Sequence, residues 1–200
     1  MIEALVIVGA YLIGSIPTGV IVGRIRGFDP RMVGSGNIGT SNVARAGGAS
    51  AAAITFAGDV LKGAIPVVVA RAIGFPHATV AWVGFAAFLG SIWSVFLRFR
   101  GGKGVAAALG VWLGIAPLVI LFALAAFGVI FALTRTMSIA SMSAAIVLPP
   151  VVAVLGLPRQ FLLLAIVMTA LVIFRHRENI QRIARGEEPR FQPKSAENLP

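Results

Sequence analysis

Hydrophobic residues are gathered into long stretches that polar or basic segments separate. The stretches cover residues 4–23, 50–70, 78–97, 104–134, 137–157 and 160–174. A helix needs about 20 mainly apolar residues to cross a bilayer. The first stretch leads into glycines and arginines without a small-residue cleavage site, so we expect a retained span and not a signal peptide. The pattern predicts an all-α protein with several membrane spans.

The stretch 104–134 is too long for a single span. Its 31 uncharged residues would form a helix of roughly 46 Å, against a hydrocarbon core of roughly 30 Å. We expect a break at Gly114-Ile115-Ala116-Pro117, because proline interrupts helical hydrogen bonding. The result is seven predicted transmembrane helices, of which the fourth, residues 104–115, is short.

Basic residues set the predicted orientation of these spans. With seven crossings, 14 of the 17 Lys and Arg fall on one side, in the segments 24–49, 98–103, around Arg135 and 175–200. Lysine and arginine are enriched in cytoplasmic loops. We therefore expect the N-terminus outside and the C-terminus in the cytoplasm, with residues 175–200 as a cytoplasmic tail. Six spans would move that tail to the far side from the other basic loops.

Composition narrows the class of function. The chain has 200 residues, of which 58% are hydrophobic and 12% charged, and its formal net charge is +10. Such a balance does not suit one water-soluble core, so we expect a single membrane domain over residues 1–200. The positive charge flanks apolar spans, which indicates membrane topology and no nucleic-acid partner. The absence of cysteine excludes disulfides, thiolate metal sites and a cysteine nucleophile.

The first basic loop concentrates groups that suit an anion. Glycines allow backbone N–H groups to converge, and Ser and Asn side chains add further donors. The loop contains a G-x-G-x-x-G spacing, but a dinucleotide site also needs a strand and a βαβ unit, which a position between two spans does not provide. A flexible polar loop is the alternative. The candidate binding residues are Gly34, Ser35, Gly36, Asn37, Gly39, Ser41, Asn42 and Arg45.

A second cluster lies at the start of the short fourth span. Gly101, Gly102, Lys103 and Gly104 combine one positive charge with backbone amides at a helix N-terminus, which suits an anion. The cluster is not a Walker A loop, because Lys103 is followed by Gly and not by Ser or Thr. A basic cap that anchors a helix at the lipid headgroups is the alternative.

A third cluster follows the last span. His176 and Asn179 are three residues apart and share one helical face, beside Arg175. A histidine that only reaches toward the membrane interface is the alternative. Intramembrane polar residues are further candidates, although ion pairing and helix packing also explain them. They form two pairs one turn apart, Asp59 with Lys62 and Ser138 with Ser141.

Together these segments resemble the acyl-phosphate-dependent glycerol-3-phosphate acyltransferases of the PlsY type. The likeness covers nearly the whole chain. It rests on Ile13-Gly14-Ser15-Ile16-Pro17, Gly34 to Gly39 with Asn42, Asp59 with Lys62-Gly63, Phe99 to Val105, Arg135 with Ser138 and Ser141, and Arg175-His176 with Asn179-Ile180. Two positions depart from the family's usual pattern. Ser91 stands where many members carry a His, so any function of that His is absent or replaced, and Thr40-Ser41 stands for the more usual Ala-Thr.

The resemblance implies an enzyme of the bacterial inner membrane with its active site on the cytoplasmic side. It implies transfer of an acyl group from acyl phosphate to the 1-position of glycerol 3-phosphate, giving lysophosphatidic acid and phosphate. It implies no cofactor and no metal, contact with membrane lipid, and a soluble partner enzyme that makes acyl phosphate. The expected catalytic residues are Ser35, Lys103, His176 and Asn179, and the expected substrate-binding residues are Gly34, Gly36, Asn37, Gly39, Ser41, Asn42, Arg45, Lys62, Gly101, Gly102, Gly104, Ser138, Ser141 and Arg175.

Other functions remain open at this point. A membrane transporter of a small phosphorylated anion is one, although such proteins usually show internal repeats and a binding site at mid-membrane. In this chain the polar clusters lie at one interface and no repeat is evident. A phosphotransferase would need carboxylates for a metal, and the chain has only seven acidic residues. The His and Asp five positions apart of the other large glycerolipid acyltransferase class are absent, because Trp82 and Gln181 stand at that distance from His77 and His176.

Overall fold

The computed structural model describes residues 1–191, and every regular element in that range is helical. The all-α prediction is confirmed. Residues 192–200, the end of the predicted cytoplasmic tail, lie outside the described range. In chain order the α-helices are α1 (Ile2–Gly14), α2 (Thr18–Ile25), α3 (Thr40–Ala72), α4 (His77–Ile92), α5 (Val105–Ile115), α6 (Pro117–Thr134), α7 (Met137–Val154), α8 (Arg159–Arg175) and α9 (Arg177–Ala184), with short 3-10 helices η1 (Pro30–Met32) and η2 (Val95–Leu97).

Helix length and hydropathy identify the candidate membrane spans. Within residues 1–191, four segments are long and apolar enough to cross a membrane alone, namely α3, α4 continued through η2, α6 and α7. Two bent pairs raise the number to as many as six, with α1 and α2 meeting at 40° and α8 and α9 at 55°. Helix α5 is apolar but has only 11 residues. A count of seven requires α5 to cross as well, so the count and the orientation remain predictions.

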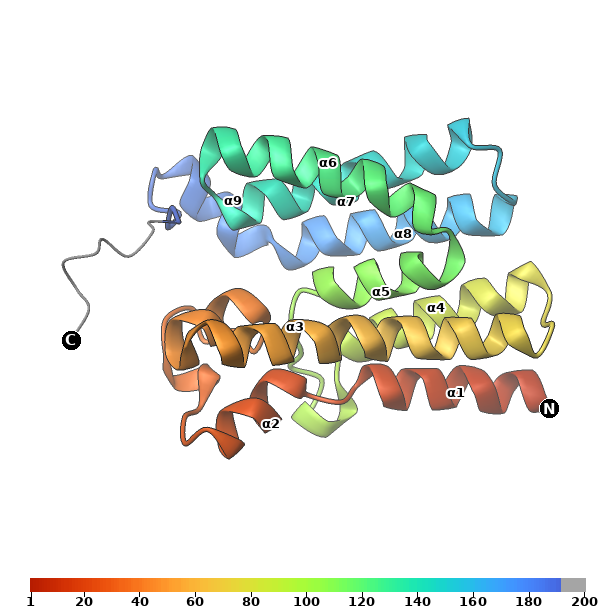
Figure 1. Cartoon of the computed structure of the whole chain (residues 1–200), viewed down its shortest axis with the longest axis horizontal. Coiled ribbons are helices and arrows are strands. Elements are labelled where there is room, and N and C mark those ends of the chain that lie inside the picture. Colours follow the sequence, from red (N-terminus) through yellow and green to blue (C-terminus); the bar gives the residue numbers. More distant parts are fainter. Residues whose placement is uncertain (192–200) are drawn as a thin grey trace.

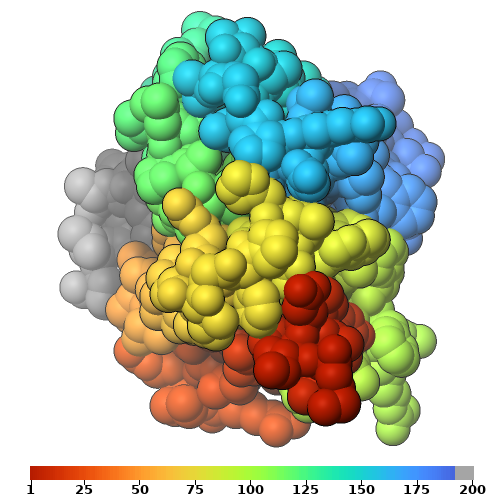
Figure 2. All heavy atoms as spheres, turned by 90° about the vertical axis from the view of Figure 1, so that its right-hand side faces the viewer, coloured from red at the N-terminus to blue at the C-terminus, as the bar shows by residue number. Residues whose placement is uncertain are grey.

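The helices form two groups on either side of the short α5. Figure 1 shows α1 to α4 on one side of α5 and α6 to α8 on the other. The N-terminus lies at one end of the bundle, and α2 and α9 lie at the opposite end. Figure 2 views the N-terminal end, where the start of α1 (red), the α3–α4 connection (yellow) and the α7–α8 connection (light blue) lie together. These are the connections that the charge pattern predicts to face outward.

The predicted break in the stretch 104–134 is confirmed. Helix α5 ends at Ile115 and α6 begins at Pro117, so Ala116 is the break. The break leaves carbonyl groups without helical partners. Those of Gly114 and Ile115 accept hydrogen bonds from Arg71 Nη1 at 2.5 Å and 3.0 Å. Arg71, one of the few basic residues outside the predicted cytoplasmic segments, thus stabilises this turn.

The first apolar stretch is also broken, which the apolar pattern of residues 4–23 did not predict. Pro17 has no backbone N–H and clashes with the preceding turn, so the chain bends between α1 and α2. The carbonyl of Ile16 accepts a hydrogen bond from Lys62 Nζ at 3.0 Å. Lys62 also forms an ion pair with Asp59 at 2.8 Å, and both side chains are largely buried. This pair on α3 therefore holds the break in the first span.

Part of the first loop is helical, where the sequence predicted a loop up to residue 49. Helix α3 begins at Thr40 and runs to Ala72, with an interruption at Gly48, whose φ is +77°. Glycine is the residue that tolerates this angle without strain. The glycine-rich segment 34–39 therefore leads directly into a helix N-terminus.

Close contact of α3 with α5 fixes the position of the short helix. A Cβ on Gly63 would overlap the carbonyl of Ala107, and one on Gly110 would overlap that of Val60. The two backbones can approach this closely only without side chains there. The neighbouring core is built around α4 and contains the fully buried side chains of Phe88, Trp112 and Met168.

A short helix, α9, follows the last span and bends away from α8. Helix α9 ends at Ala184, and Gly186 has a φ of +73°, as expected of a glycine that ends a helix. The chain then turns back toward the bundle. The N–H of Glu187 donates to the carbonyl of Arg182 at 2.8 Å, and that of Phe191 donates to the carbonyl of Arg135 at 2.7 Å.

The orientation can be tested with single cysteines, because the chain has none of its own. We expect Pro76→Cys to react with an impermeant thiol reagent added outside intact cells and Arg45→Cys to react only after permeabilisation, since basic loops stay in the cytoplasm. Labelling of both variants after permeabilisation is the control for reactivity. Labelling of Arg45→Cys from outside would contradict both the orientation and the proposed side of the site.

Candidate active site

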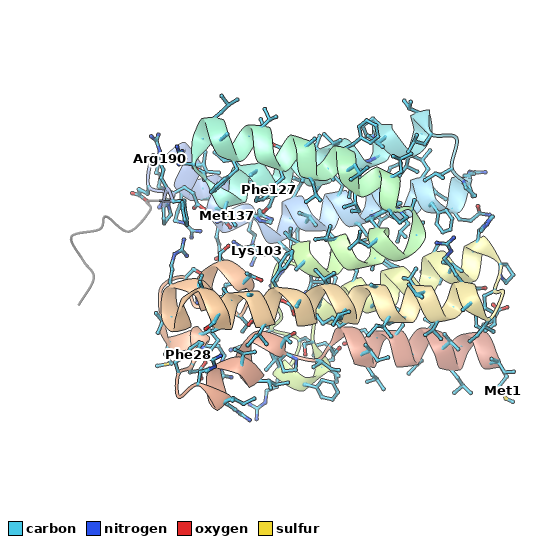
Figure 3. The ribbon with its side chains drawn as sticks, in the orientation of Figure 1. Met1, Phe28, Lys103, Phe127, Met137 and Arg190 are labelled. Carbon is cyan, nitrogen blue, oxygen red and sulfur yellow. The ribbon has the colours of Figure 1, made fainter. Side chains whose placement is uncertain are left out.

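A cavity of about 600 Å³ brings the three sequence clusters together. Its walls come from the α2–α3 loop, α3 as far as Lys62, the end of α4, the α4–α5 turn and the start of α5, α6, the start of α7, and α9 with the residues that flank it. Figure 3 shows Lys103, Phe127 and Met137 close together, although they come from different elements. The predicted residues that line the cavity are Gly34, Ser35, Asn37, Gly39, Ser41, Asn42, Arg45, Lys62, Gly102, Lys103, Gly104, Ser138, Ser141, His176 and Asn179.

Three predicted residues do not line the cavity, namely Gly36, Gly101 and Arg175. Gly36 lies in the loop before α3 with a φ of +67°. Arg175 points at the glycine turn, where its Nη2 donates to the carbonyl of Gly101 at 2.9 Å and its Nε to that of Gly102 at 3.1 Å. Arg175 therefore supports the turn that carries Lys103, and its predicted contact with substrate remains untested.

The loop before α3 is organised by Asn42. Its Oδ1 accepts a hydrogen bond from the Ser35 N–H at 3.0 Å, and its Nδ2 donates to the carbonyls of Pro30, Val33 and Asn37 at 2.6 to 2.9 Å. Asn42 is buried, so these bonds replace the water contacts of a polar amide. The loop that presents Ser35 to the cavity is thus held from within by one side chain.

The α4–α5 turn is held from two directions. The Gly102 N–H donates to the carbonyl of Ser91 at 3.0 Å, and Arg175 bonds the turn from the other side. A Cβ on Gly101 would overlap that same Ser91 carbonyl, so the turn requires glycine at this position. The Ser91 hydroxyl donates to the carbonyl of Phe88 at 2.7 Å, and Ser91 lines the cavity.

Lys103 brings a positive charge into the cavity. Within residues 1–191 its ammonium group has no hydrogen bond and no salt bridge. Burial, together with the positive charges of Arg182 and Arg45, lowers the pKa of Lys103 to about 8, while the negative charge of Glu188 acts in the opposite direction. A lysine in this environment favours a bound anion, because an anion restores the interactions that burial removed.

His176 is a neutral hydrogen-bonding group in this cavity. Burial lowers its pKa to about 4, and the positive charge of Lys103 acts in the same direction. Its Nδ1 lies 2.8 Å from the carbonyl of Val172. A carbonyl only accepts, so Nδ1 carries the proton and Nε2 is left as an acceptor. His176 can therefore accept a hydrogen bond from a hydroxyl group near neutral pH.

Sequence reasoning missed several residues of the cavity. Glu188 accepts hydrogen bonds from Ser138, Asn179 and Arg182, and Arg182 Nε pairs with it at 2.8 Å. An acidic side chain in a strongly basic tail, beside Gly186 and Pro189, was the available signal. The cavity also has an apolar wall, which includes Phe56, Phe127 and Met137. Sequence reasoning missed this wall because aromatic and methionine residues are common in any membrane span.

The cavity thus has three kinds of wall. Lys103 and Arg45 supply positive charge, His176 with the Ser138 and Asn179 side chains supplies uncharged polar groups, and the third wall is apolar. Among residues 1–191, no group of three or more His, Cys, Asp or Glu side chains is placed to hold a metal ion. Such a cavity can hold phosphate groups, a hydroxyl group and a hydrocarbon chain side by side.

Comparisons with known proteins agree over almost the whole chain. A family model described as glycerol-3-phosphate acyltransferase matches residues 4–186. Glycerol-3-phosphate acyltransferases from Geotalea daltonii and Geobacter metallireducens are 48% and 50% identical, and the alignments cover 95% and 96% of this chain and 98% and 99% of theirs.

Solved structures match equally well. The crystal structure of PlsY (YgiH), described as an integral membrane glycerol 3-phosphate acyltransferase, in its glycerol 3-phosphate form is similar with a TM-score of 0.92 and 41% identity over 96% of both chains. Its lysophosphatidic acid form gives a TM-score of 0.91 and 40% identity, again over 96% of both chains.

The charge state of Lys103 predicts how anion binding depends on pH. Sulfate is a suitable probe because its own charge does not change between pH 6 and pH 10. Its binding to the protein in detergent, measured by calorimetry, should weaken as pH rises through about 8, since only protonated Lys103 attracts the anion. Lys103→Arg should bind sulfate with little change up to pH 10, because arginine stays charged. Identical pH profiles in the two proteins would contradict this.

Proposed function

The chain belongs to the glycerol-3-phosphate acyltransferase family, and we propose that its acyl donor is an acyl phosphate. It is a membrane-embedded enzyme that transfers an acyl group to glycerol 3-phosphate and forms lysophosphatidic acid. Family membership decides between the enzyme and the transporter that the sequence alone left open. The proposal concerns the donor, the side of the membrane and the residues that act.

One observation supports the acyl phosphate donor above others. Lys103 and Arg45 line one cavity, and neither forms a salt bridge within the described chain. Acyl phosphate and glycerol 3-phosphate each carry a phosphate group, so two unpaired cations match two anions. A thioester donor has no phosphate at its reacting group and would leave one cation without a partner.

The reaction needs little help from a nucleophilic side chain. The oxygen at the 1-position of glycerol 3-phosphate attacks the carbonyl carbon, and the bond from that carbon to the bridging phosphate oxygen breaks. The bridging oxygen leaves with the bonding electrons as part of inorganic phosphate. The hydroxyl proton passes to a phosphate oxygen, because a phosphate with a pKa of about 6 takes it more readily than His176 with a pKa of about 4. Positioning and charge neutralisation then supply most of the acceleration.

Each wall of the cavity receives one part of the substrates. Lys103, Ser35 and nearby backbone N–H groups hold the acyl phosphate. Arg45, which is exposed at the cavity, holds the phosphate of glycerol 3-phosphate. His176 Nε2 and the Asn179 side chain orient the attacking hydroxyl. The other predicted cavity residues complete the walls around these groups.

The acyl chain lies along the apolar wall. Phe56 on α3 and Phe127 on α6 line the cavity from its two sides, and Met137 begins α7. Hydrocarbon in contact with these side chains is removed from water, which stabilises the bound donor by about 0.8 kcal/mol for each buried CH₂ group. The chain can then extend between helices toward the hydrocarbon of the bilayer.

The enzyme lies in the bacterial inner membrane, and its cavity opens to the cytoplasm, where glycerol 3-phosphate is present. The basic connections that form the cavity support this side, because basic loops are retained there. A soluble enzyme that makes acyl phosphate would deliver the donor to the same surface.

The donor can be tested directly with purified protein. We expect phosphate release and lysophosphatidic acid formation with acyl phosphate, and no product with an acyl thioester of the same chain length. Addition of a chelator should leave the rate unchanged, because the basic side chains neutralise the phosphates. Product from the thioester at a comparable rate, or loss of activity that magnesium restores, would overturn this part of the proposal.

The two cations can be tested by substitution. Lys103→Ala and Arg45→Ala should each lower kcat/KM by about 100-fold, because a lost charge-assisted contact costs about 3 kcal/mol. Arg185→Ala removes an exposed cation that does not line the cavity and should keep the original rate. Thermal unfolding in detergent checks that all three variants fold. A folded Lys103→Ala protein with unchanged kinetics would be incompatible with the assigned role.

A further inference from the structure

Glu188 occupies the polar wall of the cavity and contacts three side chains. The Ser138 hydroxyl and the Asn179 Nδ2 both donate to Oε1, at 2.7 Å and 2.6 Å, and Arg182 Nε donates to Oε2 at 2.8 Å. The Glu188 side chain is only 10% exposed. These three partners come from α7 and α9, so the turn after α9 carries Glu188 back between them.

The charge of Glu188 fixes the direction of these hydrogen bonds. A carboxylate has no hydrogen to donate, so it only accepts. The three hydrogen bonds lower the pKa of Glu188 even though its partial burial acts in the opposite direction, so the group is ionised near neutral pH. The amide of Asn179 must therefore turn its NH₂ group toward Glu188. The Ser138 hydroxyl must likewise use its single hydrogen for Glu188.

This arrangement leaves acceptors beside the cavity. Asn179 Oδ1 is buried and has no hydrogen-bond partner among residues 1–191, although Asn179 is a cavity residue. A buried amide oxygen without a partner is unusual, and it is satisfied when a bound group donates to it. Ser138 retains only lone pairs for a ligand. His176, three residues before Asn179, adds Nε2 as a third acceptor.

We propose that Glu188 is a positioning residue that makes Ser138 and Asn179 hydrogen-bond acceptors for a hydroxyl group of glycerol 3-phosphate. The inference rests on the proposed arrangement of substrates in the cavity. A hydroxyl group donates well to such a wall, whereas a phosphate group has lone pairs facing lone pairs and is repelled by it. Glu188 thereby directs the hydroxyl end of glycerol 3-phosphate toward α9 and leaves its phosphate to the cations.

The substitution Glu188→Gln tests the direction of the hydrogen bonds with little change in shape. Arg182 only donates, so it attracts the one oxygen of the glutamine, and the glutamine NH₂ group then faces Asn179 and Ser138. Both would have to accept from it, and Asn179 would present NH₂ to the cavity. Glu187→Gln is the matched control, because Glu187 is an exposed neighbour outside the cavity.

The measurement compares two ligands without any donor present. One is glycerol 3-phosphate, and the other is propane-1,2-diol 1-phosphate, which lacks the reacting hydroxyl. Calorimetry should show that wild type and Glu187→Gln prefer glycerol 3-phosphate by about tenfold or more, because its hydroxyl satisfies the acceptors. In Glu188→Gln the preference should fall several-fold, because His176 Nε2 is then the main acceptor left for the hydroxyl, and binding of the deoxy ligand should stay nearly unchanged. An unchanged preference in a folded Glu188→Gln protein would overturn the inference.

A second variant covers the case in which Glu188→Gln does not fold. Ser138→Ala removes one acceptor and keeps the bonds of Glu188 to Asn179 and Arg182. We expect the preference for glycerol 3-phosphate to fall several-fold, and an unchanged preference would again overturn the inference. Because these experiments use no acyl donor, their outcome is independent of whether wild-type enzyme accepts acyl phosphate. A wrong donor assignment and a wrong role for Glu188 are therefore distinguishable.

Discussion

Basic side chains that hydrogen-bond the carbonyls of broken helices hold this structure together. Hydrocarbon offers no partner to a backbone carbonyl, so every break in a span must be satisfied by the protein. Lys62 bonds the carbonyl of Ile16 and Arg71 bonds those of Gly114 and Ile115. Arg175 does the same for the carbonyls of Gly101 and Gly102 in the α4–α5 turn. Two of these side chains, Lys62 and Arg71, lie outside the basic segments that set the topology. Their positions follow from the breaks.

The breaks in turn create the cavity. The end of α4 and the short length of α5 place the glycine turn and Lys103 within the bundle, and the bend between α8 and α9 carries Asn179 and Arg182 across to it. The cations that stabilise carbonyls are already bonded, whereas Lys103 and Arg45 line the cavity without a salt bridge among residues 1–191. The cations proposed to bind substrate therefore differ from the structural ones in their partners, because both kinds are lysine or arginine.

The candidate site was largely foreseen from the sequence, with informative exceptions. Ser35, Lys103, His176 and Asn179 line one cavity, as the three clusters indicated. Arg175 and Lys62 were expected to bind substrate, which stays a prediction; the structure shows that Arg175 bonds the glycine turn and that Lys62 bonds Asp59 and the Ile16 carbonyl. A sequence motif records which residue types are needed but not which partner each one takes. Glu188 escaped notice because its partners lie 6, 9 and 50 residues away and meet only when the chain reverses after Gly186.

The sequence alone determined the all-helical class, the break before Pro117 and the membership of a membrane acyltransferase family, because hydrophobic stretch lengths, proline chemistry and ordered motifs are local properties. Only the tertiary structure decided the bond of Lys62 to the Ile16 carbonyl at the Pro17 bend, the helical start of α3 at Thr40 and the direction of each polar side chain. Those depend on contacts between distant segments, where close helix approach at Gly63 and Gly110 and the return of the chain to Glu188 select one arrangement. Hydrogen-bond direction is the clearest case. The sequence shows Ser138, Asn179 and Glu188 far apart, and only their contact in the fold directs the hydrogens of Ser138 and Asn179 toward Glu188 and leaves their lone pairs for a ligand.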